Sequence, residues 1–274
     1  CALIWAAIPL ARFVVTLIID SILPSRSVAS MDYDTLPKEG ATLTVKCEFI
    51  TCAQQAEEAC QRLIDLACSN MDSELEYSLL VDLKASSSQK DEKDLEIFEV
   101  FDKMSKYPYI NIFVRKRMLI DGKWKAYERK RGATNALNKA LITDNWQDFE
   151  YVLRKQRKPN FILVLDEDNE LMPGGVKRAV NTMLHPLNGK YTLLTFQPRY
   201  KMSSLKTAWS QRYKLESGVD GYCNYGDFYY KISGQSIYCG KGIYRLDDYA
   251  SKLEGKLPDN KVLSHDIIEG AIVS

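Results

Sequence analysis

Apolar and polar residues follow two different periods along the chain from residue 41 onward. Dense runs rich in β-branched and aromatic residues are typical of strands, and apolar residues three or four positions apart are typical of helices. The pattern predicts strands at 41–50, 76–83, 109–117, 161–166 and 191–197. It predicts helices between them at 54–70, 95–106, 133–142 and 173–184. Strands and helices therefore alternate through most of the sequence.

This alternation predicts a Rossmann-like α/β fold, with a mixed, mainly parallel sheet and helices on both faces. In such sheets ligands bind beyond the carboxyl ends of the strands. Asp82 and Asp166 each stand at the end of a predicted strand, so both are candidates for a ligand site. The first strand is not followed by GxGxxG, and no GxxxxGK[ST] occurs in the sequence. The phosphate loops of dehydrogenases and of P-loop enzymes are therefore excluded.

The first 23 residues form a nearly continuous apolar run, which is about the length that spans a bilayer. Arg12 interrupts the run at a cost of about 2.5–3.5 kcal/mol on insertion scales, and Pro9 predicts a kink. We expect a transmembrane helix over 1–23, with a buried or interfacial helix as the alternative. A polar linker over 24–40 and one domain over 41–274 follow.

Charge and cysteine content narrow the possible functions. The chain has 37 basic and 36 acidic residues, a net charge of +1, and so has no general attraction to nucleic acid. Its seven cysteines include no CxxC pair, which argues against a structural zinc site or a regular disulfide framework.

The most distinctive polar cluster is Asp166-Glu167-Asp168, which directly follows the apolar run 161–165. Residues i and i+2 of a strand point to the same face, so Asp166 and Asp168 are placed to share a divalent cation, Mg²⁺ or Mn²⁺. Such a cation would neutralise a nucleotide diphosphate. Glu167 is expected to point off that face. A solvated acidic turn is the alternative interpretation.

Two other segments carry charged residues suited to this chemistry. Arg129, Lys130 and Arg131 precede a predicted helix, where basic side chains and free N–H groups favour an anion. Asp266 lies in the first turn of a later helix and is a candidate general base. His265 beside it is a candidate to hold a phosphate or orient that base. A solvated basic turn and an ordinary helix start are the alternatives.

A glycine-rich segment precedes that last helix. Gly240 and Gly242 allow a backbone to approach a ligand closely. Tyr244 could stack on a sugar ring, or could equally belong to the core.

Taken together, these motifs resemble those of family 2-type glycosyltransferases with the GT-A fold. The segments "WKAYERKRGATNALN", "LDEDNELMPGG", "CGKGIYRLDDY" and "LPDNKVLSHDIIEG" are similar to the glycosyltransferase domain of cyclic β-1,2-glucan synthases, glycosyltransferase family 84. The resemblance runs from about Pro9 to the end of the chain.

The resemblance implies an inverting, metal-dependent transferase that extends a β-1,2-glucan from UDP-glucose. It implies a location at the cytoplasmic face of the inner membrane. Asp82 would contact the uridine, Asp166 and Asp168 would hold metal and diphosphate, and Asp266 would be the catalytic base. The donor site would also include the 129–131 cluster and His265. The residues that would bind the acceptor or the sugar are Gly240, Lys241, Gly242, Tyr244 and Glu269.

Two departures from the family pattern affect these expectations. The first strand ends in "VKCEFIT" in place of a Val-Pro-Thr-like turn, and the chain ends at Ser274 before a Q-x-x-R-W-like segment. We therefore expect a C-terminally incomplete GT-A domain. Alternatives are another processive family 2-type synthase, a nucleotidyltransferase, and a non-catalytic, membrane-tethered domain that binds a sugar nucleotide.

Overall fold

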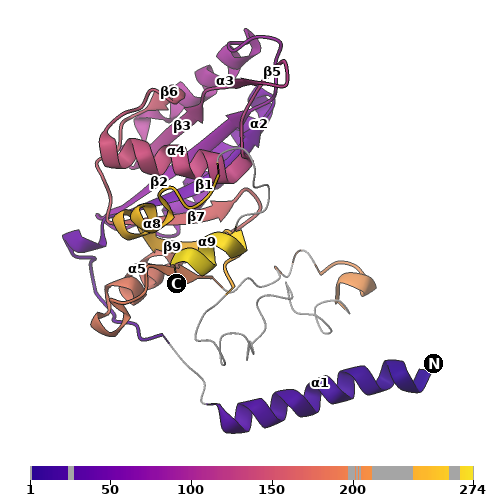
Figure 1. Ribbon diagram of the computed structural model, residues 1–274. Helices are drawn as coiled ribbons and strands as arrows, with labels where there is room; N and C mark the ends of the chain where they lie inside the picture. The colour runs from indigo at the N-terminus through magenta and orange to yellow at the C-terminus, as the bar shows by residue number, and fades with distance from the viewer. Residues whose placement is uncertain are drawn as a thin grey trace.

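The computed structural model describes residues 2–23, 28–196, 201, 203, 205–211, 237–258 and 266–273. Among these residues, seven strands form one sheet in the order β6-β3-β2-β1-β7-β9-β8 (Figure 1). The bounds are β1 Thr42–Ile50, β2 Leu75–Leu83, β3 Ile110–Arg115, β6 Phe149–Leu153, β7 Phe161–Asp166, β8 Leu193–Thr195 and β9 Gly242–Arg245. The four central strands β3, β2, β1 and β7 are parallel, and β6 and β9 run antiparallel to their neighbours. The predicted mixed, mainly parallel sheet is confirmed.

Helices cover both faces of this sheet. One hydrophobic core lies between the sheet and α2, α3 and α5, and a second lies between the sheet and α4, α8 and α9. The bounds are α2 Ala53–Cys68, α3 Lys93–Asp102, α4 Arg129–Thr143, α5 Gly175–Leu184, α8 Leu246–Leu253 and α9 Asp266–Val273. The shorter elements are η1 Lys38–Gly40, η2 Lys103–Lys106, η3 Pro186–Asn188 and the hairpin β4 Met118–Ile120 and β5 Lys123–Lys125.

The strand sequences explain which face each side chain joins. In β7, Phe161, Leu163 and Leu165 enter the α2 core, and the alternate residues Ile162 and Val164 enter the α4 core. Because both faces are covered, the central strands are apolar at nearly every position, as expected of parallel strands. The last residue of β7, Asp166, falls by this alternation on the α4 side.

The N-terminal helix α1 (Ala2–Ile22) lies apart from the sheet domain in Figure 1. Its side chains include strongly exposed apolar residues at Ile8, Leu10, Phe13 and Ile22. The part of the chain that the structure describes contains no helix both long and apolar enough to cross a membrane. The structure therefore confirms a helix here but does not support the predicted transmembrane segment.

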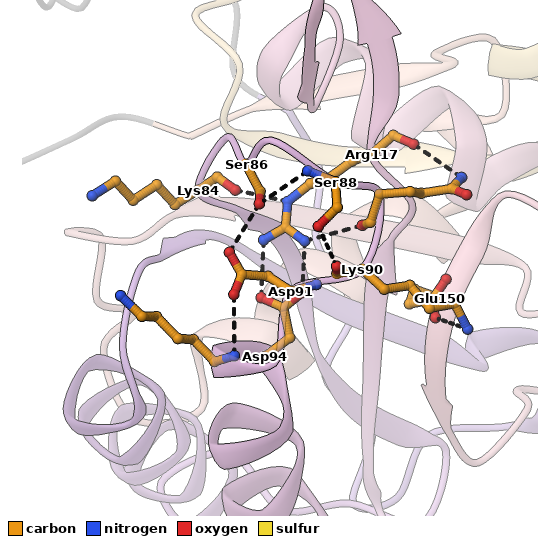
Figure 2. Close-up of polar contacts among 10 residues, drawn as sticks. Lys84, Ser86, Ser88, Lys90, Asp91, Asp94, Arg117 and Glu150 are labelled. Carbon is orange, nitrogen blue, oxygen red and sulfur yellow. Dashed lines mark hydrogen bonds and ion pairs between the residues drawn. The ribbon is translucent and has the colours of Figure 1, made fainter.

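A buried ion pair fixes the loop that follows β2. Arg117 donates two hydrogen bonds to Asp94, at 2.6 and 2.9 Å, and both side chains are less than a tenth exposed. The same guanidinium donates to the carbonyls of Lys84 and Gln89, so it ties the start and the middle of the loop to α3 (Figure 2). The pair thereby holds the segment just beyond Asp82.

Breaking this pair should destabilise the domain strongly. Asp94→Asn leaves the Arg117 charge buried without a counter-charge, so we expect a loss of about 3–5 kcal/mol in the free energy of unfolding, measured by urea denaturation. Asp121→Asn is the control, because the Asp121–Lys125 pair has one partner 84% exposed and should change stability by less than about 1 kcal/mol. Equal losses in the two variants would contradict the assignment.

Candidate active site

The candidate site lies where the strand order reverses. Both β2 and β7 pair with β1, on opposite sides, so the connection changes direction at β1. Crevices at such points, outside the carboxyl ends of the strands, are where open α/β sheets bind ligands. Asp166 ends β7 at this position and lies in register with Cys47 of β1. Burial raises the pKa of the Cys47 thiol to about 12, so this neighbour stays neutral at physiological pH.

Two lysines from distant segments meet at Asp166. The ammonium of Lys130, in the first turn of α4, contacts Oδ1 of Asp166, and the ammonium of Lys241, just before β9, lies 3.0 Å from Oδ2. Burial pushes the pKa of Asp166 upward, but the charge and hydrogen bonds of the two lysines outweigh it, and the pKa is lowered overall. The pKa of Lys241 is correspondingly raised, with its bond to Asp166 outweighing burial. Asp166 and Lys241 are therefore both charged near neutral pH.

The metal clamp expected from Asp166 and Asp168 is not formed by this arrangement. Both oxygens of Asp166 are paired with lysines, and Asp168 lines a cleft with residues of β1 and α2 instead. The physical reason is a turn that begins as β7 ends, with the Asn169 N–H donating to the Asp166 carbonyl at 3.2 Å, so strand alternation stops there. Across the described residues, no three His, Cys, Asp or Glu side chains group to hold an ion. As arranged, the residues do not fit a resident divalent cation.

Asp266 joins this centre through close backbone packing. It begins α9, and its carboxyl lies against Gly240, where a Cβ atom would stand 2.8 Å from Oδ2. Gly240 has φ +76°, and its carbonyl accepts a hydrogen bond from the Lys130 ammonium. Lys130, Gly240 and Asp266 line one small cavity of about 10 Å³. The predicted general base and one residue of the predicted basic cluster, Lys130, therefore converge. His265, predicted beside the base, lies outside the described residues.

A second glycine permits this approach of α9. A Cβ on Gly270 would stand 2.6 Å from Cβ of Tyr238, which is itself buried next to the Gly240 segment. Any larger residue at 270 would push α9 away. The short helix is thus seated so that its first residue reaches the lysine and carboxylate cluster.

Asp82 occupies the expected strand end, but its carboxylate is already engaged. Arg115 of β3 donates two hydrogen bonds to it, at 2.8 and 2.6 Å, and both residues are buried. The guanidinium also donates to the carbonyl of Arg129 at 3.1 Å and lies 4.6 Å from the centroid of the Tyr127 ring. A Cβ on Gly132 would collide with this guanidinium at 2.6 Å, so the glycine makes room for it. Asp82 and Arg115 thus position the start of α4, and a uridine contact for Asp82 stays a prediction.

The three basic residues at 129–131 diverge. Successive helix residues point about 100° apart, so a run of three cannot aim at one ligand. Lys130 reaches Asp166, the Arg129 side chain is exposed, and Arg131 is buried beside Glu128 at 2.7 Å and Glu269 at 3.5 Å. The expectation of a joint anion cluster is wrong for Arg131, because carboxylates already surround it.

Two residues predicted to bind sugar belong to the core. Tyr244 is 1% exposed, donates to Oδ1 of Asn138 at 2.9 Å and stacks on Tyr249. Glu269 is buried and accepts from the Tyr249 hydroxyl at 3.0 Å as well as pairing with Arg131. It joins α4, α8 and α9. Both residues also line the small cavity of Lys130, Gly240 and Asp266, so a sugar contact for them stays a prediction.

Gly242 is likewise a packing residue. A Cβ there would stand 2.4 Å from the carbonyl of Leu194 on β8, so glycine permits strand pairing. Its expected role in binding a sugar is contradicted. Within the glycine segment, Gly240 and Lys241 are the residues that reach the site.

Sequence reasoning missed Lys46. This lysine of β1 is 2% exposed, and its ammonium donates to the carbonyls of Glu167 and Asn169 at 3.0 and 2.9 Å. Burial lowers its pKa, with Glu48 nearby opposing the change. Lys46 therefore anchors the loop that follows Asp166. A lysine within an otherwise largely apolar predicted strand is the sequence feature that could have identified this residue.

Fold and site together define a mixed α/β domain with a charged centre at the switch point of its sheet. No protein-family model matches the chain. The chain is 28% identical over 280 residues to the cyclic beta-(1,2)-glucan synthase NdvB of Rhizobium meliloti (strain 1021). That alignment covers 90% of this chain and 10% of the synthase, so the chain spans about a tenth of its relative's length. The resemblance expected from the motifs is confirmed.

Among solved structures, the mannosyltransferase PcManGT from Pyrobaculum calidifontis, in complex with GDP-Man and Mn²⁺, is similar to this chain at a TM-score of 0.42. The sequence identity is 13%, and the match covers 87% of this chain and 54% of that chain.

Proposed function

We propose that the chain is a GT-A-type inverting glycosyltransferase domain that transfers glucose from UDP-glucose to a hydroxyl of a growing β-1,2-glucan. The observation that carries the proposal is the meeting of Lys130, Asp166, Lys241 and Asp266 around Gly240 at the switch point. The choice of glucose and of the β-1,2 linkage rests on the similarity to the glucan synthase.

The reaction requires one base and a stabilised leaving group. UDP-glucose is α-linked, so a β product needs in-line attack by the acceptor oxygen on C1. Asp266 would accept the proton from that hydroxyl as the new C1–O bond forms and the C1–O bond to phosphate breaks. The ammonium groups of Lys130 and Lys241 would lie beside the departing diphosphate and stabilise its negative charge. Asp166 would hold the two ammonium groups in place before the donor binds.

The competing activities predict different products. Supplying the protein with UDP-glucose, a β-1,2-gluco-oligosaccharide and a divalent cation should release UDP in a one-to-one ratio with chain extension. Release of pyrophosphate would instead identify a nucleotidyltransferase. Binding of UDP-glucose with no release of UDP would identify a sugar-nucleotide-binding domain and contradict the proposed transfer.

The expected location at the cytoplasmic face of the inner membrane stays a prediction. The divalent cation also stays a prediction. A cation that arrived with the donor would have to displace a lysine from Asp166 before this carboxylate could bind it.

A further inference from the structure

The turn that begins α4 has an unfavourable backbone conformation. Glu128 has φ +49° and ψ +21°, and Arg129 has φ +46°, so two successive residues with a Cβ atom lie in the left-handed region. That region is unfavourable for such residues because the Cβ crowds the following carbonyl oxygen. Strained backbone of this kind persists only where surrounding contacts hold it, and it is common at functional sites. Lys130, which reaches Asp166, directly follows these two residues.

Side-chain contacts hold both residues of this turn. The Glu128 carboxylate accepts a hydrogen bond from Nη1 of Arg131 at 2.7 Å. The Arg129 carbonyl accepts one from Nη2 of Arg115, the last residue of β3, at 3.1 Å. This carbonyl belongs to the planar peptide group that joins Arg129 to Lys130, so its orientation also sets the direction of the Lys130 side chain. The hydrogen bond from Arg115 therefore ties the start of α4 to the sheet.

Asp82 sets the direction in which this guanidinium points. Val81 and Val114 are in register on the parallel strands β2 and β3. The residues that follow them, Asp82 and Arg115, meet at the carboxyl edge of the sheet, where the carboxylate accepts from Nε at 2.8 Å and from Nη2 at 2.6 Å. Nη2 carries two hydrogens, so the second one is available to the Arg129 carbonyl. One guanidinium thus holds the carboxylate and the turn together.

The surroundings of the guanidinium keep it in this orientation. The Arg115 side chain is 1% exposed and that of Asp82 is 11% exposed. The Tyr127 ring lies over the guanidinium at 4.6 Å, and Gly132 leaves space for it, because a Cβ there would stand 2.6 Å from Nη1. Bidentate pairs of this kind add geometric specificity as well as binding energy. A continuous path of contacts therefore leads from Asp82 to the peptide group before Lys130.

We propose that Asp82 and Arg115 are positioning residues that hold Lys130 in place at the diphosphate site. The Lys130 ammonium contacts Asp166 and donates to the Gly240 carbonyl, so it bridges the end of β7 and the segment before β9. Loss of the hydrogen bond from Arg115 allows the strained turn to relax and withdraws the ammonium from both partners. That the ammonium serves a nucleotide diphosphate rests on the proposed function, whereas its placement by Arg115 does not.

A crystal structure of the Arg115→Lys variant tests the placement without any nucleotide. Lysine keeps the positive charge beside Asp82 but lacks the planar fork that reaches the carboxylate and the carbonyl together. The Lys130 ammonium should then lie away from Asp166 and from the Gly240 carbonyl. Asp82→Asn keeps the shape of the side chain, but its NH₂ group cannot accept from the guanidinium, so it should displace the ammonium as well. This second variant keeps the test valid if Arg115→Lys fails to fold. An ammonium that stays in place would overturn the proposal.

Calorimetry with UDP and with inorganic pyrophosphate separates positioning from a contact with the base. Arg115→Lys and Asp82→Asn should each weaken the binding of both ligands about tenfold, because each withdraws one cation from the diphosphate. In a Lys130→Met background the same changes should have no further effect, since the ammonium that they position is gone. The control is Arg62→Lys, which changes a partly exposed arginine of α2 paired with Glu48 and should leave binding unchanged.

Two binding results would overturn the proposal. One is a loss confined to UDP in Asp82→Asn, and the other is a loss that persists in the Lys130→Met background. Either would mean that Asp82 acts on the ligand by itself and not through the lysine. If the unmodified protein binds neither ligand, the proposed function fails, and the position of the Lys130 ammonium in the variant crystals still decides whether Arg115 holds it.

Discussion

Replacing Asp266 by asparagine should abolish sugar transfer while leaving donor binding intact. The amide keeps the size of the carboxylate and its packing against Gly240, but it cannot accept a proton from the acceptor hydroxyl. General-base catalysis contributes about 10²–10⁴-fold to such reactions, so we expect a loss of that size in UDP release at saturating UDP-glucose. Calorimetry should give the same affinity for UDP-glucose as in the unmodified protein.

Asp247→Asn is the matched control for this variant. Asp247 also lies in the first turn of a short helix, α8, but its side chain is 64% exposed and pairs with Lys158 away from the site. It should transfer sugar at the normal rate. Near-normal transfer by Asp266→Asn would show that another group removes the proton.

Replacing Gly240 by alanine should lower transfer by about 10²-fold through a clash with the base. The new Cβ would stand 2.8 Å from Oδ2 of Asp266, so the carboxyl must move. A displacement of about 1 Å in a catalytic group can cost that factor. The φ of +76° adds backbone strain of about 1–2 kcal/mol.

Gly255→Ala separates the strain from the clash. Gly255 has φ +66°, and no atom lies within 4 Å of the position of its missing Cβ. Both variants should lose similar stability in thermal unfolding, but transfer should fall in Gly240→Ala alone. Equal transfer rates in the two variants would mean that Gly240 does not hold Asp266 in position.

The central strands could be predicted from the sequence because their apolar runs reflect burial on both faces. The predicted strand 161–166 matches β7, and 41–50 matches β1 within one residue. The strand β9 was missed because its four residues follow glycines that suggested a ligand loop. Its antiparallel partners, β7 and β8, are distant in sequence, so no local pattern marked it.

The site was only partly predictable for a similar reason. Asp166 and Asp266 could be identified from the sequence because one ends a predicted strand and the other begins a predicted helix. The residues that contact them depend on tertiary packing. Neither the pairing of Asp166 with Lys241 nor the burial of Tyr244 and Glu269 follows from spacing. Because a turn begins where β7 ends, Asp168 lies in the cleft beside β1 and α2 and not on the face of Asp166. Strand alternation alone does not predict this position.

The affinity for UDP-glucose measured by calorimetry on lysine variants tests the central claim most directly. The unmodified protein should bind UDP-glucose, and Lys130→Met and Lys241→Met should each weaken binding at least about tenfold, because each removes a cation from the diphosphate. Lys125→Met, which removes a lysine paired with the exposed Asp121, should bind normally. Absence of binding by the unmodified protein, or equal binding by all three variants, would contradict a donor site at Asp166.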